Sequence, residues 1–136
     1  MKRFLLIAVV GLVGLTACKK DKPVEPQKTR KDYLTQAPWK TKEKNGSSNL
    51  DPCELDNIYT FTDTSITFNF GSNLCQGESP VPLIGTWNFY DNETKIAIDI
   101  PLQLGQSYKD SVSIIQLDDN IFEFVDKDGD RFVMQH

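Results

Sequence analysis

The sequence LIGTWNFYDNETKIAIDI, residues 83–100, decides the fold class of this 136-residue protein. Apolar and polar residues alternate in LIGTWNFY (83–90) and again in TKIAIDI (94–100), the period of a β-strand with one buried and one wet face. The segment between them, YDNET (90–94), carries Asp and Asn, which tolerate the backbone conformations of tight turns. These residues therefore predict two antiparallel strands joined by a hairpin.

The same pattern continues on both sides of this hairpin. It is clearest in SITFNFG (65–71), where Ile and Phe alternate with Thr and Asn. Eight short strands in chain order predict an all-β, eight-stranded antiparallel up-and-down barrel. A two-sheet β-sandwich is the alternative, because the strand pattern alone does not decide closure. The remaining predicted strands are WKTKE (39–43), DNIYTFT (56–62), SVSIIQL (111–117), IFEFV (121–125) and DRFVMQ (130–135).

The first 18 residues, MKRFLLIAVVGLVGLTAC, have the three parts of an export signal, so residues 1–17 are predicted to be a signal peptide. Two basic residues precede an apolar run of twelve, Phe4 to Leu15, which is shorter than the roughly 20 residues needed to span a bilayer. The ending LTAC (15–18) resembles a bacterial lipobox. That resemblance implies cleavage before Cys18 and acylation of its thiol, and several acyl chains give firm anchoring.

Residues 18–36 show no hydrophobic periodicity and predict a solvated tether. Within it, TRKDYLTQ (29–36) can form one or two helical turns with Thr29 as N-cap. Pro38 ends any such helix, so the barrel domain is expected at residues 37–136. Lys19 differs from the Asp that retains lipoproteins at the inner membrane, so we expect the outer membrane, on either face.

Two cysteines besides Cys18, namely Cys53 and Cys75, form an even pair in an exported chain. Both lie in turn-rich segments that flank the predicted hairpin 56–71, which places them at the same end of two antiparallel strands. We favour a disulfide, and a metal site or free thiols are the alternatives. The chain has one histidine, His136, which offers little support for a metal site.

Five motifs of the chain belong to one recognisable pattern. They are the lipobox cysteine, APWK (37–40), CELDNIYTF (53–61), NLCQGE (73–78) and GTWNFYDNETKIAI (85–98). Together they resemble the small lipocalin-like lipoproteins of Bacteroidetes. This resemblance implies a lipocalin-like barrel and, by analogy, a small apolar or amphipathic ligand. The chain departs from the pattern in an insert, IPLQLGQSYKD (100–110), and in the triplet Gly-Thr-Trp (85–87), which lies on the fourth strand, whereas true lipocalins carry it on the first.

Many aromatic residues fall on the predicted strands. They either line an apolar ligand cavity or fill a solid interior, because an eight-stranded barrel is about wide enough for one small ligand. The candidate ligand-binding residues are Trp39, Tyr59, Phe61, Phe68, Trp87, Phe89 and Phe124.

Two groups of acidic residues are candidate sites. Asp51, Glu54 and Asp56 could act as acid and base or bind a cation, but their loop setting favours a solvated turn. DKDGDRF (126–132) begins like a calcium loop without its later ligands and is predicted to be a hairpin turn. The sequence offers no Ser-His-Asp or Cys-His set. We therefore expect no enzymatic activity, no cofactor and no metal.

The formal net charge is −4, and it becomes −6 without the two basic residues of the signal peptide. An acidic chain of this size lacks the basic surface that nucleic acids require. We expect a monomeric lipoprotein, anchored to the outer membrane by its lipid, that binds a small hydrophobic ligand. The alternative is a structural or interaction lipoprotein whose surface contacts an envelope protein or a glycan.

Overall fold

A computed structural model describes residues 26–102 and 105–136; the predicted signal peptide and Cys18 lie outside these ranges. Two short helices, α1 (Arg30–Thr35) and α2 (Pro52–Leu55), precede the first and second strands. No helix within the described ranges is long and apolar enough to cross a bilayer. The strands are β1 (Trp39–Lys44), β2 (Ile58–Phe61), β3 (Ser65–Asn69), β4 (Leu83–Tyr90), β5 (Lys95–Pro101), β6 (Ser107–Leu117), β7 (Phe122–Val125) and β8 (Arg131–Gln135).

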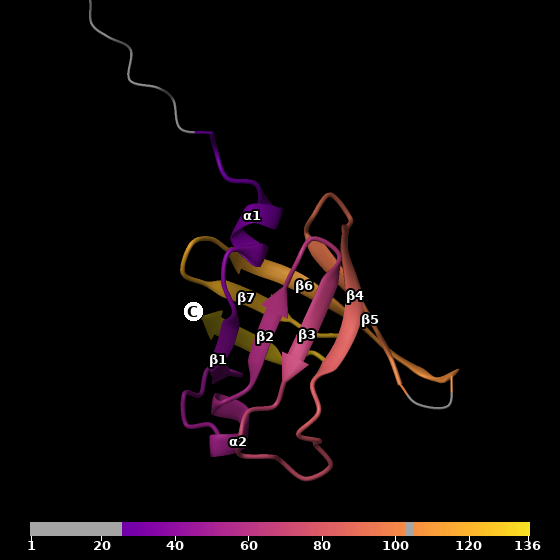
Figure 1. Cartoon of the computed structure of the whole chain (residues 1–136). Helices are drawn as coiled ribbons and strands as arrows, with labels where there is room; N and C mark the ends of the chain where they lie inside the picture. Colours follow the sequence, from indigo (N-terminus) through magenta and orange to yellow (C-terminus); the bar gives the residue numbers. More distant parts are fainter. Residues whose placement is uncertain (1–25, 103–104) are drawn as a thin grey trace, which may run out of the picture.

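The eight strands form a closed barrel (Figure 1). Each strand pairs antiparallel with the next, and β8 returns to pair with β1, where Lys40 lies opposite Gln135 and Lys44 opposite Phe132. Among the described residues, closure leaves no edge strand that could pair with another chain. The predicted all-β up-and-down barrel is confirmed, and the sandwich alternative is wrong.

The segment 100–110, predicted to be an insert, lies largely within strands β5 and β6. β5 extends to Pro101 and β6 begins at Ser107, so most of this segment lengthens one hairpin. Ile98 pairs with Asp110, and Ile100 pairs with Tyr108. The first part of β6 was not predicted because the segment is polar. Alternation of apolar and polar residues is hard to recognise when an acidic residue occupies an inward position.

Helix α1 begins with the predicted cap. The amide of Asp32 donates to Oγ1 of Thr29 at 3.2 Å, and the amide of Thr29 donates to Oδ2 of Asp32 at 2.7 Å. These reciprocal bonds satisfy backbone donors that a helix start leaves unpaired. The pKa of the Asp32 carboxyl is lowered, chiefly by the hydrogen bond from the Thr29 backbone.

Helix α1 also packs on the barrel. It contacts the turns that connect β2 to β3, β4 to β5 and β6 to β7: Lys31 pairs with Asp63 at 3.1 Å, Arg30 donates to the Glu93 carbonyl at 2.6 Å, and Lys28, just before the helix, pairs with Asp119. The short helix expected at residues 29–36 is therefore present and is packed on the turns of the barrel.

A glycine on β4 lets two strands approach closely. A Cβ at Gly85 would lie 2.5 Å from the Asp99 carbonyl oxygen and 2.8 Å from Cγ1 of Ile100. Since both contacts are tighter than packed atoms allow, any side chain at this position would push β4 away from β5. This explains the glycine of the Gly-Thr-Trp triplet on the fourth strand.

Candidate ligand-binding site

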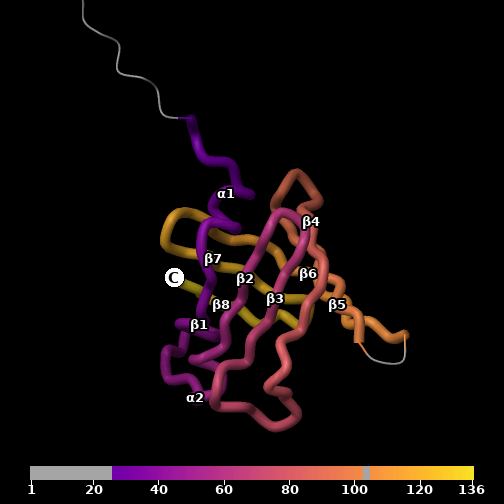
Figure 2. Tube along the Cα trace, in the orientation of Figure 1, coloured from indigo at the N-terminus to yellow at the C-terminus, as the bar shows by residue number. Residues whose placement is uncertain are grey.

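The two ends of the barrel differ. At the end covered by α1, three short turns join the strands; we call this the closed end (Figure 2). At the opposite end, which we call the open end, the connections include the longer segments 45–57 and 70–82. The long connections surround the open end, and a hollow between them leads from outside the barrel toward its interior.

The closed end is filled by aromatic side chains. Trp39 is fully buried, its Nε1 donates to the Leu34 carbonyl at 2.9 Å, and its ring packs edge-on against Phe122 at 5.7 Å. Trp87 donates from Nε1 to the Thr62 carbonyl at 2.9 Å. Each indole therefore has a hydrogen bond to a backbone carbonyl at the closed end.

A cavity of about 200 Å³ lies inside the barrel, beyond this aromatic layer. Of the seven residues predicted to bind a ligand, Tyr59, Phe61, Phe68 and Phe124 line it. Trp39, Trp87 and Phe89 do not line it; the Phe89 ring instead packs edge-on against Trp87 at 5.1 Å. The other lining residues are Ile66, Ile98, Tyr108, Asp110, Val112, Phe122, Asp126, Phe132 and Met134.

A second hollow of about 370 Å³ lies at the open end. It shares Tyr59, Phe68 and Tyr108 with the inner cavity, so these three side chains form the boundary between the two spaces. The rings of Tyr59 and Phe68 meet edge-on, with centroids 4.8 Å apart. A molecule passing from the open end to the inner cavity would move past these rings. The other lining residues are Asn57, Phe70, Glu78, Leu83, Ile100 and Leu102.

The sequence analysis missed the lining residues on β6. Tyr108, Asp110 and Val112 occupy alternate positions there and face the interior, but the first two lay in the predicted insert. The signal that could have found them is the period-two spacing itself, read from Ser107 onward without requiring every inward residue to be apolar.

Two carboxylates line this mainly aromatic cavity. Oδ2 of Asp110 accepts a hydrogen bond from the Tyr108 hydroxyl at 2.9 Å. Burial, and then this hydrogen bond, raises the pKa of Tyr108 to about 12, so the phenol stays protonated and keeps donating at neutral pH. Oδ1 of Asp126 accepts from the amides of Asp128 and Asp130, both at 2.9 Å. DKDGDRF is therefore a hairpin turn, as predicted.

A disulfide joins Cys53 to Cys75, with 5.3 Å between their Cα atoms. It connects α2 to the 70–82 segment, so it holds together two of the connections that surround the open end. Within the described ranges, no group of three or more His, Cys, Asp or Glu side chains is placed to hold a metal ion.

Asp51, Glu54 and Asp56, the acidic residues beside Cys53, organise turns. The Asp51 amide donates to Oε2 of Glu54 at 3.3 Å, at the start of α2. Oδ2 of Asp56 accepts from the amides of Ser72 and Asn73, at 3.0 and 2.9 Å. These hydrogen bonds, led by that from the Asn73 backbone, lower the pKa of Asp56 below its ordinary 3.8.

Replacing Asp56 with Asn is expected to lower the free energy of unfolding at pH 7. Because the folded-state pKa of Asp56 is depressed, its stabilising contribution is fully present above pH 3.8 and is lost as the pH falls through the folded pKa. The difference between wild type and Asp56→Asn should therefore shrink below pH 3.8. Urea unfolding of both proteins between about pH 7 and pH 2.5 measures this difference in the free energy of unfolding.

Glu93→Gln is the matched control for Asp56→Asn. Glu93 is exposed at the closed end, and within the described ranges its carboxylate takes part in no hydrogen bond or ion pair. This variant should track the wild type at every pH. A difference for Asp56→Asn that stays constant down to pH 2.5 would contradict the assignment.

Eight antiparallel strands, closed around an inner cavity, define a lipocalin-like barrel. Two solved structures share this fold. One is a lipocalin-like protein from Bacteroides uniformis, with a TM-score of 0.53, 11% identity, and coverage of 76% of this chain and 97% of the other. The second, an uncharacterized protein from Bacteroides eggerthii, has a TM-score of 0.51, 13% identity, and coverage of 72% and 95%.

At these identities the likeness shows the fold alone, and the predicted lipocalin-like barrel is confirmed at that level. Neither a protein-family model nor a curated protein matches the sequence.

Proposed function

We propose that this protein is a lipoprotein of the outer membrane whose barrel binds a small apolar or amphipathic molecule. The observation that carries the binding proposal is the inner cavity of about 200 Å³, lined mainly by aromatic and aliphatic side chains and adjoining a hollow at the open end. Eight-stranded barrels of this kind can hold one small ligand, and ligand sites are typically apolar with a few polar groups.

The size of the cavity limits the ligand. Dry apolar cavities of about 150 Å³ bind benzene-sized molecules. A cavity of about 200 Å³ therefore suits one aromatic ring, or a short aliphatic chain, with a small substituent. A longer molecule would extend past Tyr59, Phe68 and Tyr108 into the hollow at the open end.

The path of the chain supports a particular orientation. The described part begins at Pro26, and the chain enters the barrel through α1 at the closed end (Figure 1). An acyl group on Cys18 would thus tether the closed end to the bilayer, where Lys19, Lys20 and Lys22 of the tether favour contact with anionic head groups. The open end would then receive its ligand from the aqueous side.

A pair of β6 variants tests ligand binding. Val112 is buried and lines the cavity, whereas Ile115 on the same strand is 54% exposed. Indole, a neutral ring system, should bind the wild type and Ile115→Phe alike by calorimetry, and about tenfold more weakly to Val112→Phe, whose added ring occupies the cavity. Equal binding of indole by both variants, or a wild type that binds neither indole nor the phenyl probes named below, would contradict the proposal.

Replacing Cys18 with Ala tests the anchor. The wild type, expressed in a host with lipoprotein processing, should incorporate labelled palmitate and fractionate with the outer membrane. Cys18→Ala should lose both, because no other thiol takes that position after the signal peptide. Cys53→Ser is the control and should keep the label. Label that persists in Cys18→Ala would refute acylation at this residue.

A second candidate is an interaction lipoprotein that contacts an envelope protein or glycan. Val81 lies just before β4 and Ile84 near its start; both side chains are apolar, yet they are 66% and 62% exposed. The same β6 pair separates the two functions, because Val112→Phe changes the interior and leaves these surface residues in place.

A further inference from the structure

The inward-facing residues of β6 include one carboxylate, that of Asp110. Asp110 lies between Tyr108 and Val112 on the inward face, and its partner across the β5–β6 ladder is Ile98, which is almost fully buried. An aliphatic residue at this position would pack against Ile98 and reduce the cavity. The Asp110 carboxylate is instead half-buried, and it needs a polar or charged partner to the extent that a bound molecule displaces its water.

A second carboxylate lies close to the first. Ser113 pairs with Val125, the last residue of β7, and extending this register by one residue beyond the strand places Asp126 next to Val112. Asp110 is then a diagonal neighbour of Asp126, at roughly 7–8 Å between Cα atoms. Both side chains line the cavity, and this spacing lets one ammonium group contact an oxygen of each.

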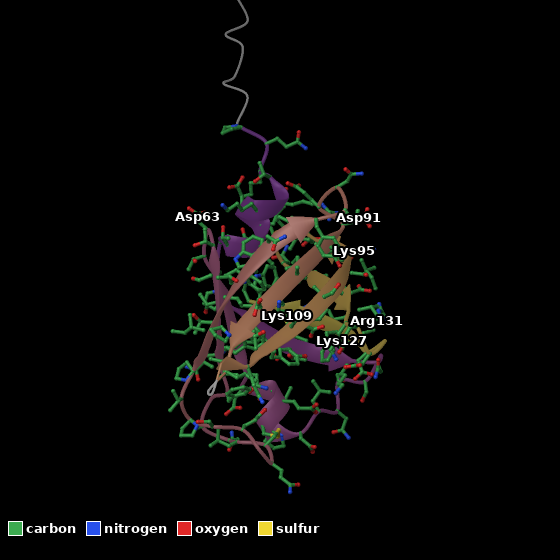
Figure 3. All side chains as sticks on the ribbon, turned by 90° about the vertical axis from the view of Figure 1, so that its right-hand side faces the viewer. Asp63, Asp91, Lys95, Lys109, Lys127 and Arg131 are labelled. Atoms are coloured by element: carbon green, nitrogen blue, oxygen red, sulfur yellow. A yellow bond between two sulfur atoms is a disulfide. The ribbon has the colours of Figure 1, made fainter. Side chains whose placement is uncertain are left out.

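Within the described residues, the protein offsets the charge of these two carboxylates only in part. Asp110 accepts hydrogen bonds from the Ser111 amide and the Tyr108 hydroxyl, and Asp126 accepts from two backbone amides. Within the described ranges no lysine or arginine pairs with either carboxylate. Two lysines occupy neighbouring positions, and both are labelled in Figure 3. Lys109 pairs with Asp99 at 3.4 Å. Lys127 pairs with Asp128 at 2.7 Å, and its ammonium also lies 5.9 Å from the centroid of the Tyr108 ring and interacts electrostatically with Asp110 at longer range.

The rest of the cavity also suits a cation with an aromatic body. Phe124 and Phe132 stack at 5.3 Å, and Tyr59 and Phe68 complete an aromatic wall whose ring faces attract positive charge. Over a longer range, residues 45–136 carry four Lys or Arg against 15 Asp or Glu, a formal charge of −11. Such a field raises the local concentration of cations and speeds their association.

From these observations we infer that the cavity selects a small amphipathic amine, with its ring among the aromatic side chains and its ammonium between Asp110 and Asp126. The inference rests on the proposed binding function and adds the charge of the ligand. The carboxylates and the ring faces supply the recognition, and the volume limits the body to about one ring.

Three probes with the same phenyl body and different charge test the inference: 2-phenylethylamine, 2-phenylethanol and 3-phenylpropionate. Calorimetry at pH 7 uses the chain from Lys19 onward, in which every strand of the closed barrel is present. The amine should bind about tenfold more tightly than the alcohol, and the carboxylate most weakly, because only the amine makes charge-assisted hydrogen bonds with both carboxylates. The preference should decrease at high salt.

Asp110→Asn should remove most of the preference for the amine and leave the alcohol affinity unchanged. Asp126→Asn, which keeps an oxygen for the turn amides, should act in the same direction. Asp99→Asn is the control: its carboxylate pairs with Lys109 and does not line the cavity, so the preference should persist. Thermal unfolding of each variant verifies that it is folded.

Equal affinity for the amine and the alcohol, or an amine preference that Asp110→Asn and Asp126→Asn leave intact, would overturn the inference while ligand binding stands. Failure of all three probes and of indole to bind would overturn the proposed function itself, and the inference with it.

Discussion

Replacing Trp39 with Ala is expected to lower the free energy of unfolding by about 4 kcal/mol, in the range found for buried aromatic residues. The Trp39 side chain is fully buried under α1 and packs edge-on against Phe122. Its removal would leave a cavity at the closed end and would leave the Leu34 carbonyl without its indole donor. Because α1 packs on this layer, the helix should also become less protected from hydrogen exchange.

Trp39→Phe separates the two contributions. Phenylalanine keeps most of the ring packing and loses only the hydrogen bond to Leu34, so a loss of about 1–2 kcal/mol is expected. Urea unfolding of the chain from Lys19 onward measures both variants. A loss of less than about 1 kcal/mol for Trp39→Ala would mean that the aromatic layer does not stabilise the closed end.

Removing the disulfide is expected to cost about 3 kcal/mol, the chain-entropy value for a 22-residue separation. The bridge restricts the unfolded chain and, in the folded state, joins α2 to the 70–82 segment at the open end. The double variant Cys53→Ser, Cys75→Ser should unfold at correspondingly lower urea concentration.

Reductant supplies the control for this prediction. Dithiothreitol should shift the wild type to the midpoint of the double variant and should leave the double variant unchanged. A wild type whose unfolding is indifferent to reductant would mean that the bridge is absent or contributes nothing to stability.

Local patterns in the sequence predicted most of the fold. Period-two alternation identified all eight strands, and Asp, Asn and Gly identified the short turns, because a half-buried strand and a tight turn each impose their own residue types. The Thr29 cap of α1 was also predicted, since it depends on residues three apart. The segment 100–110 was misjudged because an inward Asp110 interrupts the apolar row.

The candidate site was predicted less completely. Aromatic residues were expected to line a cavity or fill the barrel, and both outcomes occur in different layers: Tyr59 and Phe68 border the cavity, whereas Trp39 and Trp87 pack at the closed end. Alternation identifies which side chains point inward, but it carries no information about depth along the barrel axis. Depth depends on register and on what covers each end.

The sequence by itself determined the strands and their order, and it favoured the pairing of Cys53 with Cys75. These features follow from contacts between near neighbours in the chain or from residue types. Only the tertiary structure decided that α1 covers one end, through contacts such as Lys28 with Asp119, which lie 91 residues apart. Only it brought Asp110 and Asp126 together at one aromatic cavity. Such contacts form when the sheet closes, and no local pattern encodes the geometry of closure.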